Sequence, residues 1–115
     1  MNDLLNTSTL GELQEILGDD LLDITALFAE QVVVEADALK QQIQAQDLGG
    51  VARHAHAMKG SCGNVGAMAL SVWAAALEKA AKAGDLAAAT TAVNALPALL
   101  DGTLAAMRQQ GYLKV

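Results

Sequence analysis

The 115-residue chain has one cysteine and one proline, and aromatic residues make up only 3% of it. A single cysteine excludes an internal disulfide framework and cannot by itself build a zinc site. No uninterrupted apolar stretch approaches the ~18 residues that cross a bilayer, so we expect no membrane span. The opening residues MNDLLNTSTLGELQE lack the basic and then apolar segments of a signal peptide. These absences predict a reducing, cytoplasmic setting.

Positive charge is also scarce, because seven Lys and Arg stand against thirteen Asp and Glu, giving a net charge of −6. The seven cations are spread along the sequence, whereas nucleic-acid binding needs clustered Lys and Arg to contact phosphates. An anionic membrane surface is disfavoured for the same reason. Solubility is a sufficient explanation of the acidity, and we expect neither nucleic acid nor a membrane as a partner.

What the chain does contain is small and helix-favouring apolar residues. It is 53% hydrophobic, and this apolar mass is mostly Ala, Leu and Val. Strand-like runs are nearly absent apart from Val32-Val33-Val34. The length suits one domain, which buries roughly two thirds of its unfolded surface. Composition therefore predicts a single all-α domain over residues 1–115.

Turn-forming residues divide the chain into expected helices. The first is short, with Thr7 or Ser8 as its N-cap and Gly18 as its stop. The second follows a cap at Asp19 or Asp20. Its apolar residues form a stripe at helical spacing, consisting of Leu21, Ile24, Phe28, Val32, Leu39 and Ile43.

Two further helices are expected in the middle of the chain. One begins near Asp47 and ends near Gly63, and the next covers roughly residues 66–83, with Gly84 after it. The apolar face of the later helix consists of Leu70, Trp73, Ala74, Leu77 and Ala81.

The last expected helix begins at Asp85 and ends at Gly111. We expect Pro97 to kink it, because proline lacks the amide hydrogen that would bond to the carbonyl of Val93. Its inner stripe comprises Leu86, Thr90, Val93, Leu100, Leu104 and Met107. Four substantial helices joined by short turns imply antiparallel neighbours. The predicted fold is an up-and-down antiparallel four-helix bundle with a short extra N-terminal helix.

Both histidines and the only cysteine fall in the stretch HAHAMKGSCGNVGA, residues 54–67. At about 100° per residue, one sector of this helix collects the apolar positions Leu48, Val51, Ala55, Met58 and Cys62. His54 and His56 lie on opposite flanks of that sector. Ligands on one helix must be three or four residues apart to share a metal ion, so these two histidines cannot share one.

Cys62 points into the core in this arrangement, which disfavours a nucleophilic Cys–His pair and favours a small buried hydrophobe. Gly60, Gly63 and Gly66 are spaced three apart and follow no strand. That spacing fits neither the dinucleotide fingerprint nor the P-loop, so nucleotide binding is not supported. A ligand-binding or metal-binding bundle also lacks paired ligands within the core.

The surroundings of His56 are unusual for an exposed histidine. Positions one or two turns away on the same helix face are Ala52, Arg53, Lys59, Gly60 and Gly63. A glycine within a helix costs about 1 kcal/mol relative to alanine. Small residues therefore indicate that a partner approaches the backbone here, and the cations indicate that an anionic group arrives. His54 lacks such small neighbours, and we expect it to be a bystander.

The run ARHAHAMKGSCGNVGA resembles the signature of histidine-containing phosphotransfer (HPt) domains. That signature is Ala-His, any residue, an aliphatic residue and Lys-Gly-Ser, with Gly-Ala shortly after. The resemblance covers about residues 20–110 and implies that His56 is phosphorylated. It further implies that Lys59 gives charge support and that Gly60 leaves access for the partner. The departures are mild, since only Met58 and Cys62 replace the frequent leucine and serine.

The resemblance implies a phosphoryl-carrier intermediate in a two-component phosphorelay, without an ATP site of its own. His56 would carry the phosphoryl group between aspartates of response-regulator receiver domains, and a hybrid sensor kinase would be a further partner. No cofactor or bound metal is expected, magnesium being supplied by the receiver, and we expect a monomer. The alternative is a docking module that binds receivers or kinases without being phosphorylated.

Two residues of the fourth expected helix stay without an assigned role. Glu78 and Lys82, one turn apart, occupy positions where HPt domains often have polar groups facing the histidine. A solvated ion pair on the helix surface is the other interpretation.

Overall fold

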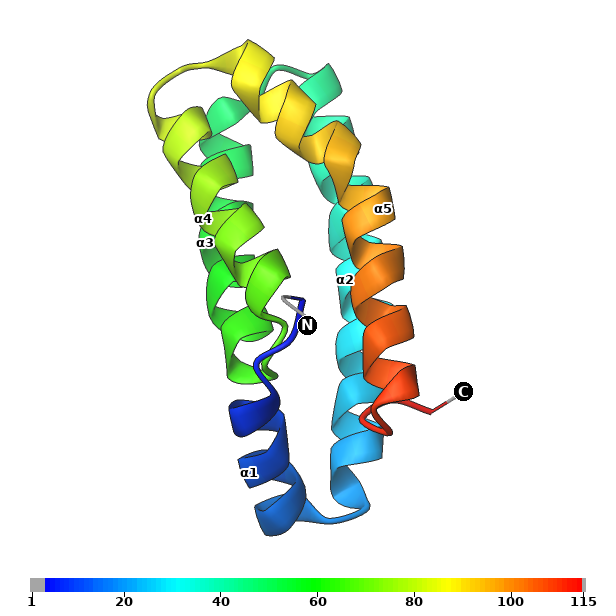
Figure 1. Cartoon of the computed structure of the whole chain (residues 1–115). Coiled ribbons are helices and arrows are strands. Elements are labelled where there is room, and N and C mark those ends of the chain that lie inside the picture. The colour runs from blue at the N-terminus through cyan, green and yellow to red at the C-terminus, as the bar shows by residue number, and fades with distance from the viewer. Residues whose placement is uncertain (1–3, 115) are drawn as a thin grey trace.

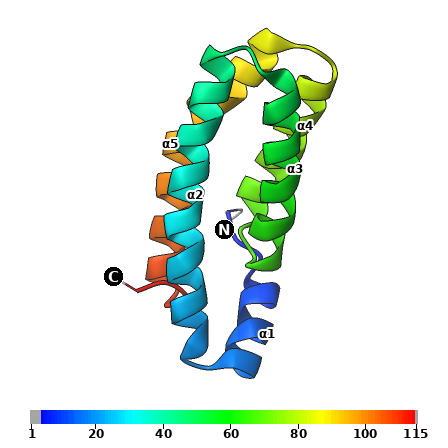
Figure 2. The same cartoon turned by 180° about the vertical axis from the view of Figure 1, so that it is seen from behind.

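The computed structural model describes residues 4–114, and this span contains five α-helices and no strand. The helices are α1 (Thr7–Leu17), α2 (Asp20–Gln44), α3 (Leu48–Asn64), α4 (Met68–Lys82) and α5 (Leu86–Gln109). The last four run alternately up and down, with α3 packed against α4 and α2 beside α5 (Figure 1). Figure 2 shows the same pairs from behind. The predicted all-α bundle with a short N-terminal helix is confirmed.

The short helix α1 makes up for a difference in helix length. α2 has 25 residues and α3 has 17, which correspond to about 37 Å and 25 Å at ~1.5 Å per residue. α1 lies beyond the end of the α3–α4 pair, next to the first turns of α2 (Figure 1). Its Leu10 is fully buried, and the Asn6 amide donates to the Gly66 carbonyl at 2.8 Å. The N-terminal segment is thereby attached to the turn between α3 and α4.

The start of α1 differs by one residue from the expectation. Asn6 is the N-cap, in place of Thr7 or Ser8, and its side-chain oxygen accepts a hydrogen bond from the Thr9 amide at 3.2 Å. Asn caps a helix as well as Ser does, so Asn6 can begin the helix one residue before Thr7. Gly18 ends α1 with a positive φ of 57°, as expected.

The starts of α3 and α5 are confirmed. Asp47 accepts a hydrogen bond from the Gly50 amide at 2.9 Å, and Asp85 accepts one from the Ala88 amide at 3.0 Å. Each carboxylate satisfies a backbone donor that the first turn of the helix leaves unpaired. Asp19 precedes α2, but its side chain makes no such bond.

The turn into α4 depends on Gly66, which has a φ of 77°. A Cβ on this residue would lie 2.9 Å from the Leu10 side chain and 3.1 Å from the Asn6 carbonyl oxygen. Only glycine combines this backbone conformation with such close packing against the N-terminal segment. α4 therefore begins after the turn, at Met68, two residues later than expected.

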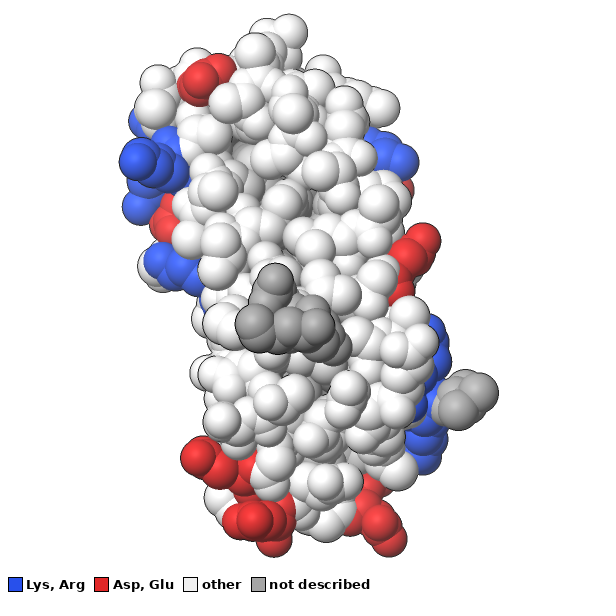
Figure 3. Space-filling model, in the orientation of Figure 1, with Lys and Arg blue, Asp and Glu red and all other residues white. Residues whose placement is uncertain are grey.

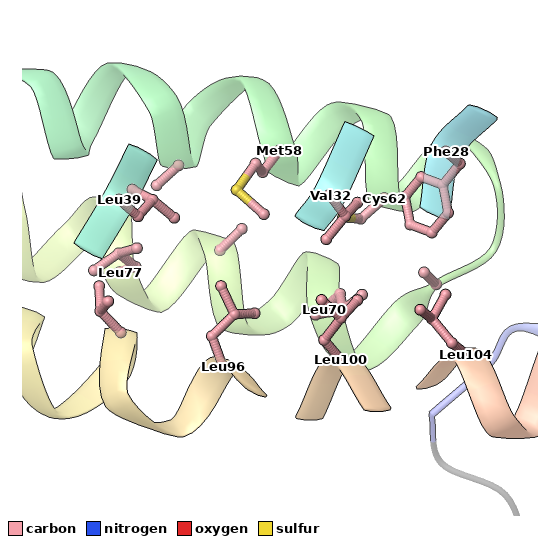
Figure 4. Close-up of a cluster of buried hydrophobic side chains, with 14 of the residues drawn as sticks. Phe28, Val32, Leu39, Met58, Cys62, Leu70, Leu77, Leu96, Leu100 and Leu104 are labelled. Carbon is pink, nitrogen blue, oxygen red and sulfur yellow. The ribbon is translucent and has the colours of Figure 1, made fainter. Parts of the chain in front are cut away.

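The core runs the length of the bundle and is built mainly of Leu, Ala, Val and Met (Figure 4). The expected apolar sector of α3 faces it, and Met58 and Cys62 are fully buried. Ile24 was expected in the α2 stripe, and this is wrong because the residue is 40% exposed. Thr25 takes the inward position instead, since Ile24 lies roughly 60° from the centre of the stripe.

Pro97 lies inside α5, where the helix continues through it. Figure 1 shows the first turns of α5 leaning at an angle to the remainder, as expected of a helix that lacks one amide donor. Leu86 and Thr90, expected on the inner stripe, are only partly buried. They lie on the flank of the buried face that Ala89, Val93 and Leu96 form. No helix within residues 4–114 is long and apolar enough to cross a membrane.

Candidate functional site

His56 lies on α3, on the flank of the buried sector, and its side chain is 68% exposed. The adjacent Ala55 is fully buried, so the backbone at this point is packed against the bundle. The well-packed helix α3 therefore presents the imidazole to solvent while its backbone at residue 56 is held in place.

The imidazole is anchored by a carboxylate from the neighbouring helix. Glu78 of α4 lies at the edge of that helix's apolar stripe, next to Leu77, and its side chain is only 9% exposed. Its Oε2 lies 2.9 Å from His56 Nδ1. Of the two residues left without a role, Glu78 therefore proves to be a direct contact of the histidine.

The contact fixes which nitrogen of His56 is protonated. Hydrogen bonds from Lys82 lower the pKa of Glu78 most, and those from Lys59 and His56 add to this against the opposing effect of burial. The resulting pKa is about 2, so the carboxylate is ionised at neutral pH. An ionised carboxylate only accepts hydrogen bonds. His56 must therefore donate from Nδ1, so in the neutral imidazole the lone pair is on Nε2.

Two lysines share the Glu78 carboxylate with the histidine. Lys82, one turn later on α4, binds the same oxygen as His56, Oε2, at 3.0 Å. Lys59 of α3 binds the other oxygen, Oε1, at 3.2 Å. The Ser71 hydroxyl also donates to the Lys59 carbonyl at 2.9 Å, which adds a link between α3 and α4. The site therefore has an excess of positive charge around one buried acid.

Gly60 lies one turn beyond His56 on the exposed face of α3. A Cβ at this position would have no non-local atom within 4 Å. The fold itself does not require glycine here, in contrast to Gly66, so the open surface beside His56 needs another explanation. This open space is what access for a partner requires.

A groove of about 410 Å³ opens beside the imidazole, between α3 and α4. We call it the His56 groove, and its lining consists of Ala52, Arg53, His56, Glu78 and Lys82. Its walls combine the imidazole, the small residue Ala52 and the two cations Arg53 and Lys82, which outnumber the one ionised carboxylate, Glu78. This net positive charge suits an anionic group.

His54 occupies a different environment from His56. Its side chain is 22% exposed, and Nε2 lies 3.3 Å from Oε2 of Glu35 on α2. Burial raises the pKa of Glu35, and the charge and hydrogen bonding of His54 partly oppose that rise. The pair links α2 to α3 and is not aimed at solvent. His54 therefore lies where a bystander was expected.

Cys62 is fully buried, as expected for a small core residue. Burial, assisted by the negative charge of Glu35, raises the pKa of its thiol to about 12. A thiol with this pKa holds almost no thiolate near neutral pH, and thiolate is the reactive form.

Glu35 and Glu78 are the residues whose placement the sequence left unassigned. Each is a carboxylate at helical spacing from core residues: Glu35 lies between Val32 and Leu39, and Glu78 follows Ala74 by one turn. An acid at such a position needs a partner when buried. This signal was readable in the sequence, although the identity of the partner was not.

Comparisons with known proteins identify the family of the chain. A family model described as the Hpt domain matches residues 23–110, which is most of the chain. Searches among curated proteins and solved structures gave no significant match. With its helical bundle and the motif ARHAHAMKGSCGNVGA on α3, the chain therefore belongs to the Hpt domain family, whose members act in histidine phosphotransfer within two-component phosphorelays.

Proposed function

We propose that this protein carries a phosphoryl group on His56 between aspartates of response-regulator receiver domains. The observation that carries the proposal is the 2.9 Å contact from His56 Nδ1 to the ionised Glu78. It leaves Nε2 as the free nucleophile on an imidazole that is 68% exposed. No other histidine in residues 4–114 combines exposure with an anchored ring, since His54 is partly buried against Glu35.

In the first step, the Nε2 lone pair attacks the phosphorus of a receiver's aspartyl phosphate. The P–Nε2 bond forms, the P–O bond breaks, and the aspartate leaves as a carboxylate. Because Nδ1 keeps its hydrogen, the imidazole becomes positively charged. Glu78 is already in place and ionised, so it stabilises this charge without reorganisation. In the second step, the carboxylate of another receiver attacks phosphorus, and the electron pair of the P–N bond returns to Nε2.

Lys59 and Gly60 complete the proposed site. Lys59 supplies positive charge that offsets the charge of the transferring group, which is the main protein contribution to phosphoryl transfer. In the unphosphorylated protein its ammonium lies 3.2 Å from Glu78. Gly60 leaves open the surface on which a receiver must place its own active-site loops. Magnesium would belong to the receiver, and the chain would need no ATP site of its own.

The test is transfer from a receiver domain that has been loaded with radiolabelled acetyl phosphate. We expect label on this protein as an adduct that is labile in acid and stable in base. His56→Gln should abolish it, whereas His54→Gln should retain it. Circular dichroism would verify that both variants are helical. Undiminished labelling of His56→Gln would overturn the proposal, and receiver binding without any transfer would favour a docking module.

A further inference from the structure

Four of the seven cations of the chain lie on α3 and α4, although they are spread along the sequence. Figure 3 shows Lys and Arg side chains, with acid between them, along the edge formed by these helices. They line two grooves, and Lys82 lines both. The second groove, of about 280 Å³, is lined by Lys59, Ala75, Glu78, Lys79 and Lys82, and it does not contain His56. The cations that share a groove with His56 are therefore Arg53 and Lys82.

Arg53 is the unpaired cation of the His56 groove within residues 4–114. Within residues 4–114, its guanidinium makes neither an ion pair nor a hydrogen bond. It lies over Gly49, with Nη1 3.5 Å from where a Cβ of that glycine would be. Arg53 precedes His56 by three residues, so the two side chains are neighbours on one helix face, about 5–6 Å apart at Cβ. Because the side chain is exposed and lines the His56 groove, a change of its rotamer would let the guanidinium reach a group carried by the imidazole.

Lys82 is the second cation of the His56 groove. It binds Oε2, the oxygen that also accepts from His56 Nδ1, whereas Lys59 binds Oε1. The ammonium of Lys82 and Nδ1 of His56 therefore share one carboxylate oxygen, and both residues line the His56 groove. Ala52 adds no bulk to the groove, so a tetrahedral anion has room between the two helices.

We propose that the phosphoryl group on Nε2 of His56 is seated in the His56 groove and is held there by Arg53 and Lys82. This inference rests on the proposed function and adds the residues that bind the carried group. A phosphoryl dianion presents oxygens in the geometry that a guanidinium binds with two parallel hydrogen bonds. Arg53 would supply that fork, and Lys82 would supply a point charge. Both are positioning residues for a group that His56 carries.

The experiment loads the full chain with phosphoramidate, a small donor that needs no receiver, and follows the phosphohistidine by ³¹P NMR. The readout is the pKa of the second ionisation of the phosphoryl group, because nearby cations favour the dianion and lower this value. Arg53→Gln should raise it by about half a unit, a roughly threefold change in the ionisation constant. Arg53→Lys should restore part of the difference. Labelling by phosphoramidate should slow about three- to tenfold in Arg53→Gln.

Lys79→Gln is the matched control for the Lys82→Gln variant. Both lysines are exposed on α4, but Lys79 lines only the groove that lacks His56. Lys82→Gln should raise the phosphoryl pKa, and Lys79→Gln should leave it at the wild-type value at about 0.15 M salt, because screening weakens distant charges. Because Lys82 also binds Glu78, Arg53→Gln is the deciding variant.

The outcomes separate this inference from the proposed function. If the wild-type chain forms no phosphohistidine at His56, the proposed function itself fails. If it does, but Arg53→Gln and Lys79→Gln give the same phosphoryl pKa, the assignment of Arg53 is overturned while the carrier role stands. A rise confined to Lys59→Gln would place the phosphoryl group in the other groove and would also overturn the assignment.

Discussion

Replacing Glu78 tests how the charge beside His56 supports phosphorylation. Glu78→Gln removes the negative charge but keeps an oxygen that accepts a hydrogen bond from Nδ1. Glu78→Ala removes the charge and the acceptor together. The two variants therefore separate stabilisation of the imidazolium from orientation of the ring.

The size of the effect follows from the geometry of the contact. The imidazole becomes positive during transfer while Oε2 lies 2.9 Å from Nδ1. The carboxylate is 9% exposed, so water cannot readily take its place. We expect phosphorylation to slow about tenfold in Glu78→Gln, for loss of a charge-assisted hydrogen bond. Glu78→Ala should slow it about a hundredfold, because the Nδ1–H tautomer and the ring orientation are lost as well.

The assay measures the rate of phosphohistidine formation with phosphoramidate in excess, so that no receiver interface contributes. Glu12→Gln, an exposed acid on α1, is the matched control and should react at the wild-type rate. Circular dichroism would show whether the helices are retained. Wild-type rates in Glu78→Ala would refute the reasoning, as would a slower reaction in Glu78→Gln than in Glu78→Ala.

Three further predictions concern stability and access. The pKa of Glu78 is about 2 against an ordinary value of 4.5. Its contacts therefore stabilise the fold above pH 4.5, and this contribution is lost as the pH falls through about 2. Urea unfolding at a series of pH values should show this loss in the wild type and not in Glu78→Gln. Gly60→Ala and Gly11→Ala should each stabilise the fold by about 1 kcal/mol, because both are helical glycines where an added Cβ would meet open space. Gly60→Leu, by contrast, should slow transfer from a receiver but not from phosphoramidate. Leu77→Ala, at a fully buried site, should lower the free energy of unfolding by about 2–5 kcal/mol, whereas Val72→Ala, at a site 65% exposed, should change it little.

Each of these predictions has a contradicting result. If the free energy of unfolding of Glu78→Gln falls at low pH as much as that of the wild type, the ion pairs around this residue do not stabilise the fold. Equal slowing of both donors by Gly60→Leu would mean that the glycine serves His56 itself and not partner access. A small effect of Leu77→Ala would show that the core relaxes around the lost side chain.

Local rules were sufficient to predict most of the fold. Helical periodicity and caps such as Asp47 and Asp85 depend on residues within one or two turns, and the structure agrees with them. Ile24 was misplaced because a single stripe residue can lie at the edge of the buried sector, and only the packing of the neighbouring helices decides its exposure.

The site was predictable only in its local part. The pattern around His56 on α3 is contained in one stretch of sequence and therefore stood out. Its contact with Glu78 spans 22 residues and depends on how α3 and α4 are aligned. The same alignment brings Arg53 and Lys82 to one groove. Periodicity within each helix carries no information about the rotation of one helix against another.

The central claim is that His56 carries the phosphoryl group on Nε2 because Glu78 holds Nδ1–H. The most direct measurement is NMR of the phosphorylated chain with ¹⁵N-labelled histidine, in which one-bond ³¹P–¹⁵N coupling identifies the nitrogen that bears phosphorus. We predict coupling to Nε2 of His56 alone. Coupling to Nδ1 of His56, or to either nitrogen of His54, would contradict the account.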